Sequence, residues 1–499
     1  MATIGREKVS KAVAEKIDRS AGHCDELLQL KAFRKQWFWK CCAAVFTVKF
    51  LLIPCYHSTD FEVHRNWMAI THTLPLQSWY YDSTSHWTLD YPPFFAFFEY
   101  LLSEVASVFV PSALVLQKNA YFSSELLFFQ RSSVIVTDFF YTSFTVRRPM
   151  PSHRFIGNCL GFFQLLGALS YCVLLNMKHI YLYYGPAYVL FFAVNYLAPI
   201  KKQFVFRCIK LALVIFVTFA LSLGPFVYAC GGAVLLQIWR RLFPFKRGLT
   251  HAYWAPNLWA IYNFIDWYFY QVLKLTKRLS SDIRPPMYTS GLVQEFSHSV
   301  LPSVSAFGAL ITTGVLLMPV LMLVGTRHIR NFPLLLTLSA FAFFLAGYHV
   351  HEKAVILITI PYTVLAAMDH RLLPSYLLLS FVANVSLFPL FFTLFENLLK
   401  VSISLCYLFF SWTVMRFVCP QGALCVLQKL YICGLLVVQI YCLLVHQWLF
   451  GANLKFIPLM LTSLSTAAGI CWAYLELLWI ITFEDAHAVC ICGKKQKSV

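Results

Sequence analysis

Long apolar runs recur along almost the whole chain and are separated by short polar stretches. A membrane-spanning helix needs about 20 apolar residues, and about twelve runs approach or exceed that length. Such runs favour helices over the shorter strands of a membrane barrel. The pattern predicts an all-α polytopic membrane protein with spans at 38–56, 126–146, 155–175, 178–198, 205–229, 301–324, 331–347, 353–369, 373–393, 397–415, 430–447 and 456–482.

Short loops rich in Lys and Arg fall on one side when these spans alternate, and by the positive-inside rule that side is the cytosol. We therefore expect a cytosolic segment 1–37, a transmembrane domain 38–482 with luminal loops 57–125 and 230–300, and a cytosolic tail 483–499. The basic residues behind this orientation are Arg147, Arg148, Arg154, Lys201, Lys202, Arg327, Arg330, His370, Arg371, Arg416, Lys429 and the Lys494 to Lys497 tail.

The composition supports this class and excludes others. Hydrophobic residues make up 59% of the 499 residues and charged residues 12%, with a mean hydropathy of +0.66, which excludes a soluble globule. The net charge of +18 is dispersed in short loops, so it indicates membrane topology and no nucleic-acid partner. The chain has no G-x-x-x-x-G-K-[ST] sequence, which argues against an ATP-driven pump. Its 16 cysteines fall mostly in spans or on the cytosolic side, so no luminal disulfide framework is expected.

The two ends of the chain favour the endoplasmic reticulum. The first forty residues begin polar and charged, which predicts no cleaved signal peptide. The C-terminal Lys495-Gln-Lys497 resembles the dilysine retrieval signal of reticulum membrane proteins. The alternative is a basic tail attracted to anionic headgroups.

The stretch from His57 to Tyr100 is polar, acidic and rich in aromatic residues, and it follows the first span directly. Thr59 and Glu62 stand at capping-box spacing, and apolar residues follow at helical steps. This predicts an amphipathic helix that starts near Asp60 and lies on the membrane surface. Pro92 and Pro93 open a second apolar run, which also reads as an interfacial helix.

Several residues of this stretch have the chemistry to hold a sugar. Glu62 and Arg65 could bind sugar hydroxyls, although an ion pair between positions i and i+3 explains both. Trp79 and Trp87 could stack on sugar rings, or they could belong to an interfacial aromatic belt. Asp90 could bind a hydroxyl, or it could be a turn residue before the prolines.

A second polar cluster, His349, His351, Glu352 and Lys353, lies at the luminal mouth of two apolar spans. Charged residues near hydrocarbon are costly, so the cluster indicates an anionic partner. The alternative is a salt bridge between Glu352 and Lys353. A zinc site is a weaker interpretation, because His-x-His lacks further ligands. We expect His349, His351 and Lys353 to bind phosphate, with no metal.

Lys246 and Arg247 belong to a third basic group, which also contains Arg240 and Arg241 in the predicted luminal loop 230–300. The positive-inside rule weakens for a loop of this length. We expect Lys246 and Arg247 to attract a lipid-linked phosphate through charge-assisted hydrogen bonds.

Four stretches together resemble a known family: HSTDFEVHRNWMAITHTLPLQSWYYDSTSHWTLDYPPFFAFFEYLLS from His57, RLFPFKRGLTHAYWAPNLWAIYN (241–263), TSGLVQEF (289–296) and GYHVHEKAVIL (347–357). They are similar to the dolichyl-phosphate-glucose-dependent α-1,3-glucosyltransferases of the N-glycan precursor pathway, which have the GT-C fold. The KRGLTHAYWAPN version resembles the members that add the second glucose.

The resemblance implies inverting transfer of glucose from dolichyl-phosphate-glucose to Glc1Man9GlcNAc2 on dolichyl pyrophosphate, with no cofactor. Because phosphate leaves without protonation, one carboxylate suffices as the general base. Asp60 matches the family's Asp position. From the residues alone, a first-turn acid stabilised by the helix dipole is the more common explanation of Asp60, and the resemblance to the family favours the catalytic role instead. The His349 to Lys353 cluster would bind the donor phosphate.

One departure from the family concerns Arg147 to Leu166. The family normally carries two more spans there around a luminal His-x-x-x-Gln-Tyr-Asn sequence, and this chain has only about 20 residues. The loss of two spans preserves the alternation of sides, so the chain can still insert. Two other classes therefore stay open: a catalytically impaired, non-catalytic membrane protein, and a lipid-linked sugar transporter, although a transporter would typically show internal repeats.

Overall fold

The computed structural model describes residues 36–147, 153–199, 201–243, 248–391, 393–419, 424–451 and 453–484. Within these ranges every regular element is a helix, apart from one isolated β-bridge between Thr250 and Val350. The all-α expectation is therefore confirmed for the described residues. The chain divides into two compact units, one formed by 1–73 and 102–151 and the other by 74–101 and 152–499.

The first unit contains a helix at 36–51, α2 (Asp60–Thr73), the end of α3 (Pro93–Phe109), the short η2 (Pro111–Leu114) and α4 (Ser124–Arg147). Its core is a cluster of apolar side chains from α2, α3, η2 and α4. Arg131 of α4 donates hydrogen bonds to the carbonyls of Leu52 (2.5 Å), Ile53 (2.7 Å) and Tyr56 (2.7 Å). These bonds tie α4 to the turn that follows the first helix.

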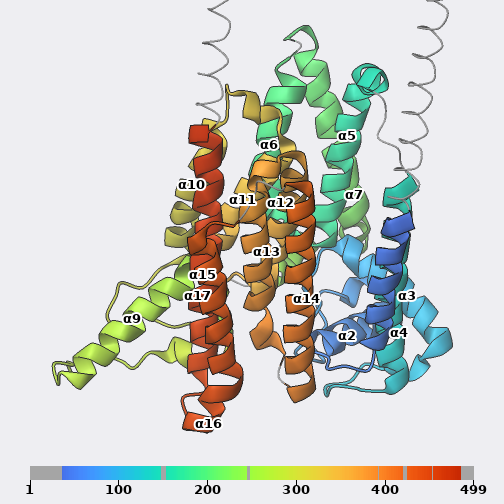
Figure 1. Cartoon of the computed structure of the whole chain (residues 1–499). Helices are drawn as coiled ribbons and strands as arrows, with labels where there is room; N and C mark the ends of the chain where they lie inside the picture. The colour runs from blue at the N-terminus through green and yellow to red at the C-terminus, as the bar shows by residue number, and fades with distance from the viewer. Residues whose placement is uncertain are drawn as a thin grey trace, which may run out of the picture. The chain divides into compact units, whose positions relative to one another are not determined.

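The second unit is a helical bundle (Figure 1). Its helices are α5 (His153–Met177), α6 (Gly185–Phe192), α7 (Phe204–Cys230), α8 (Ala233–Leu242), α9 (Leu258–Leu275), α10 (Ala306–Met322), α11 (Phe332–Ala346), α12 (Ile356–Met368), α13 (Leu373–Ser386), α14 (Leu394–Val418), α15 (Val426–Ile440), α16 (His446–Phe450) and α17 (Phe456–Trp479).

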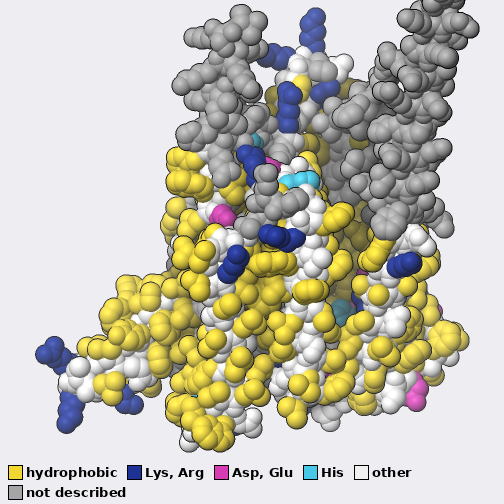
Figure 2. All heavy atoms as spheres, viewed as in Figure 1, with side chains coloured by type: hydrophobic (Ala, Val, Ile, Leu, Met, Phe, Trp, Pro, Cys, Tyr) yellow, Lys and Arg dark blue, Asp and Glu magenta, His cyan; other side chains and the backbone are white. Residues whose placement is uncertain are grey.

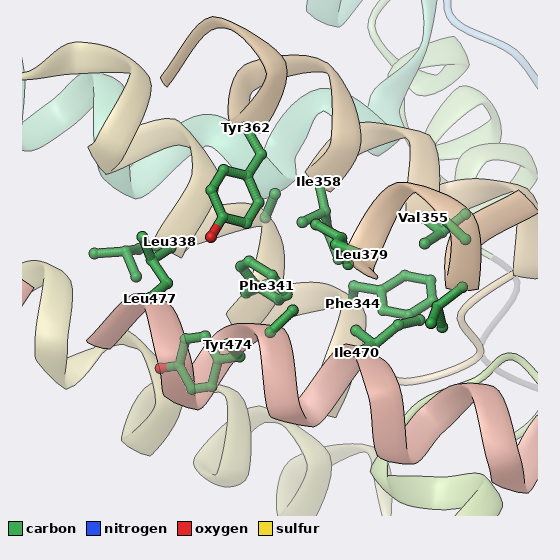
Figure 3. Packing of buried hydrophobic residues seen from close by; sticks show 14 of the residues in the cluster. Leu338, Phe341, Phe344, Val355, Ile358, Tyr362, Leu379, Ile470, Tyr474 and Leu477 are labelled. Atoms are coloured by element: carbon green, nitrogen blue, oxygen red, sulfur yellow. The ribbon is translucent and has the colours of Figure 1, made fainter. Parts of the chain in front are cut away.

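Helices α11 and α13 lie at the centre of this bundle. Both are uncharged and mostly apolar, as expected for helices enclosed by others, and most of their side chains are buried. Helix α11 packs against α10 and α12, and α13 packs against α12, α14 and α17. Figure 3 shows Phe341 and Phe344 of α11 meeting Ile470 and Tyr474 of α17. This packing fixes the helix ends from which the candidate site projects.

Apolar side chains also cover much of the outside of the helices (Figure 2). Exposed apolar surface of this extent marks contact with a membrane or a partner. Five helices are long and apolar enough to cross a membrane: Lys201–Cys230, His370–Leu390, Leu394–Val418, Val426–Phe450 and Phe456–Phe483. Phe163–Met177, Ala306–Met322 and Phe332–Ala346 are shorter apolar helices. The chain is therefore a multi-pass membrane protein.

Helical structure occurs in each of the predicted spans, although not always as one continuous helix. The predicted luminal loop 230–300 contains two helices, α8 and α9. The predicted span 178–198 is broken into η3 (His179–Tyr184), α6 and the π-turn Ala193–Leu197. Helix α2 starts at Asp60 as predicted, but Arg65 to Thr71 are all buried, so it does not present one face to solvent as a surface helix would. Most of 1–37 and 483–499 lies outside the described residues.

Candidate functional site

Asp60 occupies the first position of α2 and is exposed. The backbone N–H of Asp60 donates to the Ser58 hydroxyl at 3.3 Å. Asp60 therefore combines solvent access with a helix N-terminus, where the helix dipole favours an ionised carboxylate. The predicted capping box between Thr59 and Glu62 does not form, because the Glu62 carboxylate binds other partners.

Glu62 and Arg65 form the buried ion pair that the spacing allowed. Arg65 Nε donates to Glu62 Oε1 at 3.0 Å, and Nη1 donates to the carbonyl of Val115 at 2.7 Å. The other Glu62 oxygen accepts the backbone N–H of Tyr121 at 3.0 Å. Both side chains are almost fully buried. The pair therefore fixes α2 to the segment that follows α3, and so fixes the position of Asp60.

In the second unit, the predicted sugar-binding residues Trp79, Trp87 and Asp90 divide into two kinds. Trp79 is buried, donates from Nε1 to the carbonyl of Leu74 at 3.0 Å, and packs against Phe226 at 5.9 Å between ring centroids. Its role in the structure is packing. Trp87 and Asp90 are half-buried, so their side chains remain partly accessible.

Helix α8 holds the loop that carries these residues. Arg241 donates from Nε to the carbonyl of Tyr80 and from Nη2 to the carbonyl of Asp82, both at 3.0 Å. Gln237 donates to the same Tyr80 carbonyl at 2.9 Å. The guanidinium of Arg241 therefore positions the loop. Lys246 and Arg247 lie outside the described residues.

The second cluster gathers around a buried carboxylate, Glu352. His251 Nδ1 lies 3.1 Å from Glu352 Oε1, and His351 Nδ1 lies 2.9 Å from Oε2. The two imidazole rings are 4.4 Å apart between centroids. The alternative that the sequence allows is a salt bridge between Glu352 and Lys353. In the structure, both carboxylate oxygens of Glu352 lie beside histidines instead.

Burial by itself opposes ionisation of Glu352, but the hydrogen bond from His251 and the nearby His351 imidazole outweigh it and lower the pKa of the carboxyl to about 2. Glu352 is therefore an anion that accepts Nδ1–H from His251, whereas His351 Nδ1 accepts the backbone N–H of Lys353 at 3.2 Å and lies beside the carboxylate without donating to it. This arrangement directs the Nε2 atom of each ring away from the carboxylate, which leaves two nitrogens for a ligand.

Backbone contacts between two distant loops build this cluster. Thr250 and Val350 form the β-bridge, and the N–H of His349 donates to the carbonyl of Leu249 at 2.8 Å. His349 Nδ1 donates to the carbonyl of Gly248 at 3.0 Å. Gly248 has φ +80° and a Cβ there would lie 2.2 Å from the Gln294 carbonyl oxygen. Only glycine fits that position.

His349 itself has φ +53°, a conformation that costs a non-glycine residue about 1–3 kcal/mol. Its Nδ1 is occupied by the Gly248 carbonyl, and its ring lies 5.8 Å from His251 between centroids. The structure thus brings both predicted histidines beside a third that the sequence analysis did not single out. His251 lay within the 241–263 stretch, and its neighbour Thr250 forms the β-bridge to Val350.

Asp266 of α9 anchors the other side of the same loop region. Its carboxylate accepts the N–H groups of Ser299 (2.8 Å), Val300 (2.8 Å) and Leu301 (2.7 Å), and the hydroxyl of Tyr288 at 2.5 Å. Burial raises the pKa of the carboxyl, but these four bonds outweigh burial and lower the pKa below its ordinary value.

His298 and Asn263 continue this network to the histidine cluster. His298 Nε2 lies 3.0 Å from Asn263 Oδ1, and the Asn263 amide donates to the Thr250 hydroxyl at 3.3 Å. Burial lowers the pKa of His298 despite the nearby negative charge of Asp266. Through Thr250, this network supports the β-bridge beside His251.

His251, His351 and Glu352 also have the geometry of a metal site, because one ligand atom from each lies within 4.8 Å of the others. The sequence analysis considered only His349 and His351 as ligands. Phosphate and a metal ion are therefore both chemically compatible with this cluster, and experiment separates them.

Comparison with known proteins shows similarity along most of the chain. A sequence model of the ALG6, ALG8 glycosyltransferase family matches residues 45–151 and 156–477. Relatives named dolichyl pyrophosphate Glc1Man9GlcNAc2 alpha-1,3-glucosyltransferase are 40% identical in Caenorhabditis elegans, and 38% identical in Mus musculus and in Bos taurus.

The extent of these alignments differs between relatives. The alignments cover 89% of this chain for the nematode protein and 88% for the other two. The chain spans 65% of the nematode protein's length, but 95% of the mouse and bovine proteins. The family match is broken between residues 151 and 156, within the stretch where the sequence predicts a missing segment.

Proposed function

The chain belongs to the ALG6, ALG8 glycosyltransferase family, and we propose that it transfers glucose from dolichyl-phosphate-glucose to Glc1Man9GlcNAc2 on dolichyl pyrophosphate. The product is an α-1,3 bond formed on the luminal side of the endoplasmic reticulum membrane. The observation that carries this proposal is the match with relatives of that name over 88% of the chain. The fold is of the GT-C type with about twelve spans and both termini in the cytosol.

The reaction proceeds by one displacement at the anomeric carbon of the donor. A hydroxyl oxygen of the acceptor forms the new bond to that carbon as the bond to the phosphate oxygen breaks. The electron pair of the breaking bond stays on the phosphate, which leaves as an anion. The hydroxyl proton passes to Asp60, whose exposed carboxylate at the start of α2 suits a general base. Such a base accelerates a reaction by about 10² to 10⁴-fold.

The leaving phosphate is bound by the histidine cluster. His351 and His251 are held by Glu352 at 2.9 and 3.1 Å, so each ring is oriented before the donor binds. Lys353 follows Glu352 and adds a positive charge, and Lys246 and Arg247 are proposed to add two more. Fixed donors facing a developing anion stabilise the transition state without reorganisation.

The sugar rings are proposed to lie against Trp87 and Asp90, which are partly accessible. The buried Trp79, Glu62 and Arg65 contribute to sugar binding by holding the loop and α2 in place. Positioning of this kind is effective, since a misplacement of about 1 Å can reduce a rate by about 10²-fold.

A second candidate is a catalytically impaired member of the family, favoured by the break in the family match between residues 151 and 156. Expression in cells that lack the corresponding glucosyltransferase separates the two. If the lipid-linked precursor becomes glucosylated beyond Glc1Man9GlcNAc2, the chain is an active transferase. If the Glc1Man9GlcNAc2 precursor accumulates while the chain is inserted in the membrane, the chain is a catalytically impaired member of the family.

A further inference from the structure

A cavity of about 510 Å³ lies at the ends of α14, α15 and α17 in the second unit. Its wall comes from segments far apart in sequence: the loop around Ser290, the turn around Phe391, the start of α14 and the residues that precede α17. The spans predicted from sequence place each of these segments on the luminal side. A cavity of this volume is large enough for a small polar ligand.

The described lining residues include two lysines and no carboxylate. Lys400 of α14 is buried, with 9% of its surface exposed. Its ammonium donates to the carbonyls of Phe388 (2.9 Å) and Phe391 (3.2 Å) and lies 5.3 Å from the centre of the Phe388 ring. Two of its three N–H groups are thus occupied. Lys455, just before α17, is exposed. The cavity therefore has a positive charge in its wall and another at its edge.

Uncharged polar groups occupy the same wall. The Asn397 Oδ1 atom is buried and accepts no hydrogen bond from the described residues, which is a costly state for a buried acceptor. Gln439 donates to the Thr462 hydroxyl at 3.2 Å, and both residues line the cavity. Asn397, Gln439 and Thr462 give the wall uncharged polar groups that suit hydroxyls, and the lysines suit phosphate, so the ligand chemistry indicated is a phosphate joined to a sugar.

The cavity adjoins the histidine cluster through the segment 251–254. Tyr253 lines the cavity, and its ring lies 6.4 Å from the ring of His251 between centroids. The carbonyl of Trp254, the next residue, accepts a hydrogen bond from Ser463 of α17 at 2.7 Å. The segment 251–254 therefore connects the cavity to the histidine cluster, and each of these two sites has groups that can bind phosphate.

We propose that this cavity binds the pyrophosphate and first sugar of the lipid-linked acceptor, while the histidine cluster binds the donor phosphate. The inference rests on the proposed function, since that reaction requires two anionic lipid substrates at once. Lys400 and Lys455 contact the pyrophosphate, and Asn397 accepts a hydroxyl of the first sugar.

The test uses the full chain with Lys455→Gln and Lys400→Gln, and Lys429→Gln as the matched control. Lys429 lies on α15 and is exposed, but it does not line the cavity. Binding of a short-chain dolichyl-pyrophosphate-GlcNAc2 is measured without turnover, beside dolichyl phosphate and inorganic pyrophosphate. Thermal unfolding in detergent shows whether each variant is folded. If Lys400→Gln does not fold, Lys455→Gln alone tests the proposal, because it alters an exposed residue.

Loss of a charge-assisted hydrogen bond is expected to weaken binding of the pyrophosphate lipid by about tenfold or more. The affinity of both lysine variants for dolichyl phosphate is expected to stay unchanged. Lys429→Gln is expected to bind the pyrophosphate lipid as the parent protein does. Equal weakening for dolichyl phosphate assigns the cavity to the donor and overturns the inference, as does unchanged binding of the pyrophosphate lipid by folded Lys455→Gln. If inorganic pyrophosphate alone accounts for the binding, the sugar contact is wrong. Because no turnover is needed, the binding result stands even if the chain transfers no glucose.

Discussion

Glu352 shows how a single buried residue can organise a site. Its carboxylate faces His251 and His351, and its pKa is lowered from 4.5 to about 2. A group whose folded-state pKa is lowered stabilises the protein above its unfolded pKa. The contribution of Glu352 is therefore fully present near neutral pH and is lost only as the pH falls from about 4.5 toward 2.

Glu352→Gln is predicted to reduce kcat/KM for the donor by about 10²-fold, because the amide removes the negative charge that lies beside both imidazoles and weakens the bond that orients His251. Glu295→Gln is the control, since Glu295 is exposed in a loop of the same unit. Initial rates at varied donor concentration measure the effect. An unchanged kcat/KM in Glu352→Gln would show that the histidine cluster takes no part in the reaction.

The phosphate and metal interpretations of the cluster predict different responses to chelators. With phosphate as the ligand, EDTA leaves glucose transfer unchanged, while His351→Ala and Lys353→Ala raise the KM for the donor more than that for the acceptor. Transfer that stops in EDTA and returns with a divalent ion would contradict the phosphate interpretation and favour a metal-dependent mechanism, for which His251, His351 and Glu352 are the candidate ligands.

At the scale of elements, α2 depends on a buried ion pair. Breaking such a pair by removing one partner costs about 3–5 kcal/mol, whereas an exposed pair contributes about 0–1 kcal/mol. Arg65→Ala is therefore predicted to lower the unfolding temperature much more than Arg371→Ala, which breaks the exposed pair with Asp369. Thermal unfolding of both variants in the same detergent measures this. Equal shifts would contradict the role assigned to Arg65.

Asp266 supports the segment after α9 in a similar way. Asp266→Ala leaves three backbone N–H groups and the Tyr288 hydroxyl without their acceptor, which is predicted to cost about 3 kcal/mol or more at neutral pH. Because the folded-state pKa of Asp266 is lowered, its stabilisation is present above the unfolded pKa and is lost as the pH falls through the folded value. The difference from the parent protein should therefore shrink on acidification, and a difference that grows would refute this assignment.

The helices could be predicted from sequence because their apolar runs are long, and the start of α2 at Asp60 followed from local periodicity. The burial of α2 could not, because the acceptors of Arg65 at Ala113 and Val115 come from a distant segment. His251 was missed for the same reason, since only the bridge between Thr250 and Val350 brings it to Glu352. Residue spacing within one segment predicts pairs such as Glu62 and Arg65. Contacts between segments that are distant in sequence can be identified only from the folded structure.

At the scale of the whole molecule, the break in the family match between residues 151 and 156 bears directly on activity. The family's luminal loops are expected to hold the base and to cover the donor sugar, and a displacement of about 1 Å can cost about 10²-fold in rate. We expect this chain to insert into the membrane and to transfer glucose slowly. A chimera in which the corresponding segment of the mouse relative replaces residues 152–155 should be faster.

Glucose transfer by purified parent and Asp60→Asn proteins, in both the present chain and the chimera, tests the central claim most directly. The assay supplies dolichyl-phosphate-glucose and a Glc1Man9GlcNAc2 lipid acceptor, and membrane insertion is checked for every variant. A general base is worth at least about 10²-fold, so Asp60→Asn should retain less than a tenth of its parent's rate. Retention of more than a tenth, or no transfer by either parent, would contradict the account.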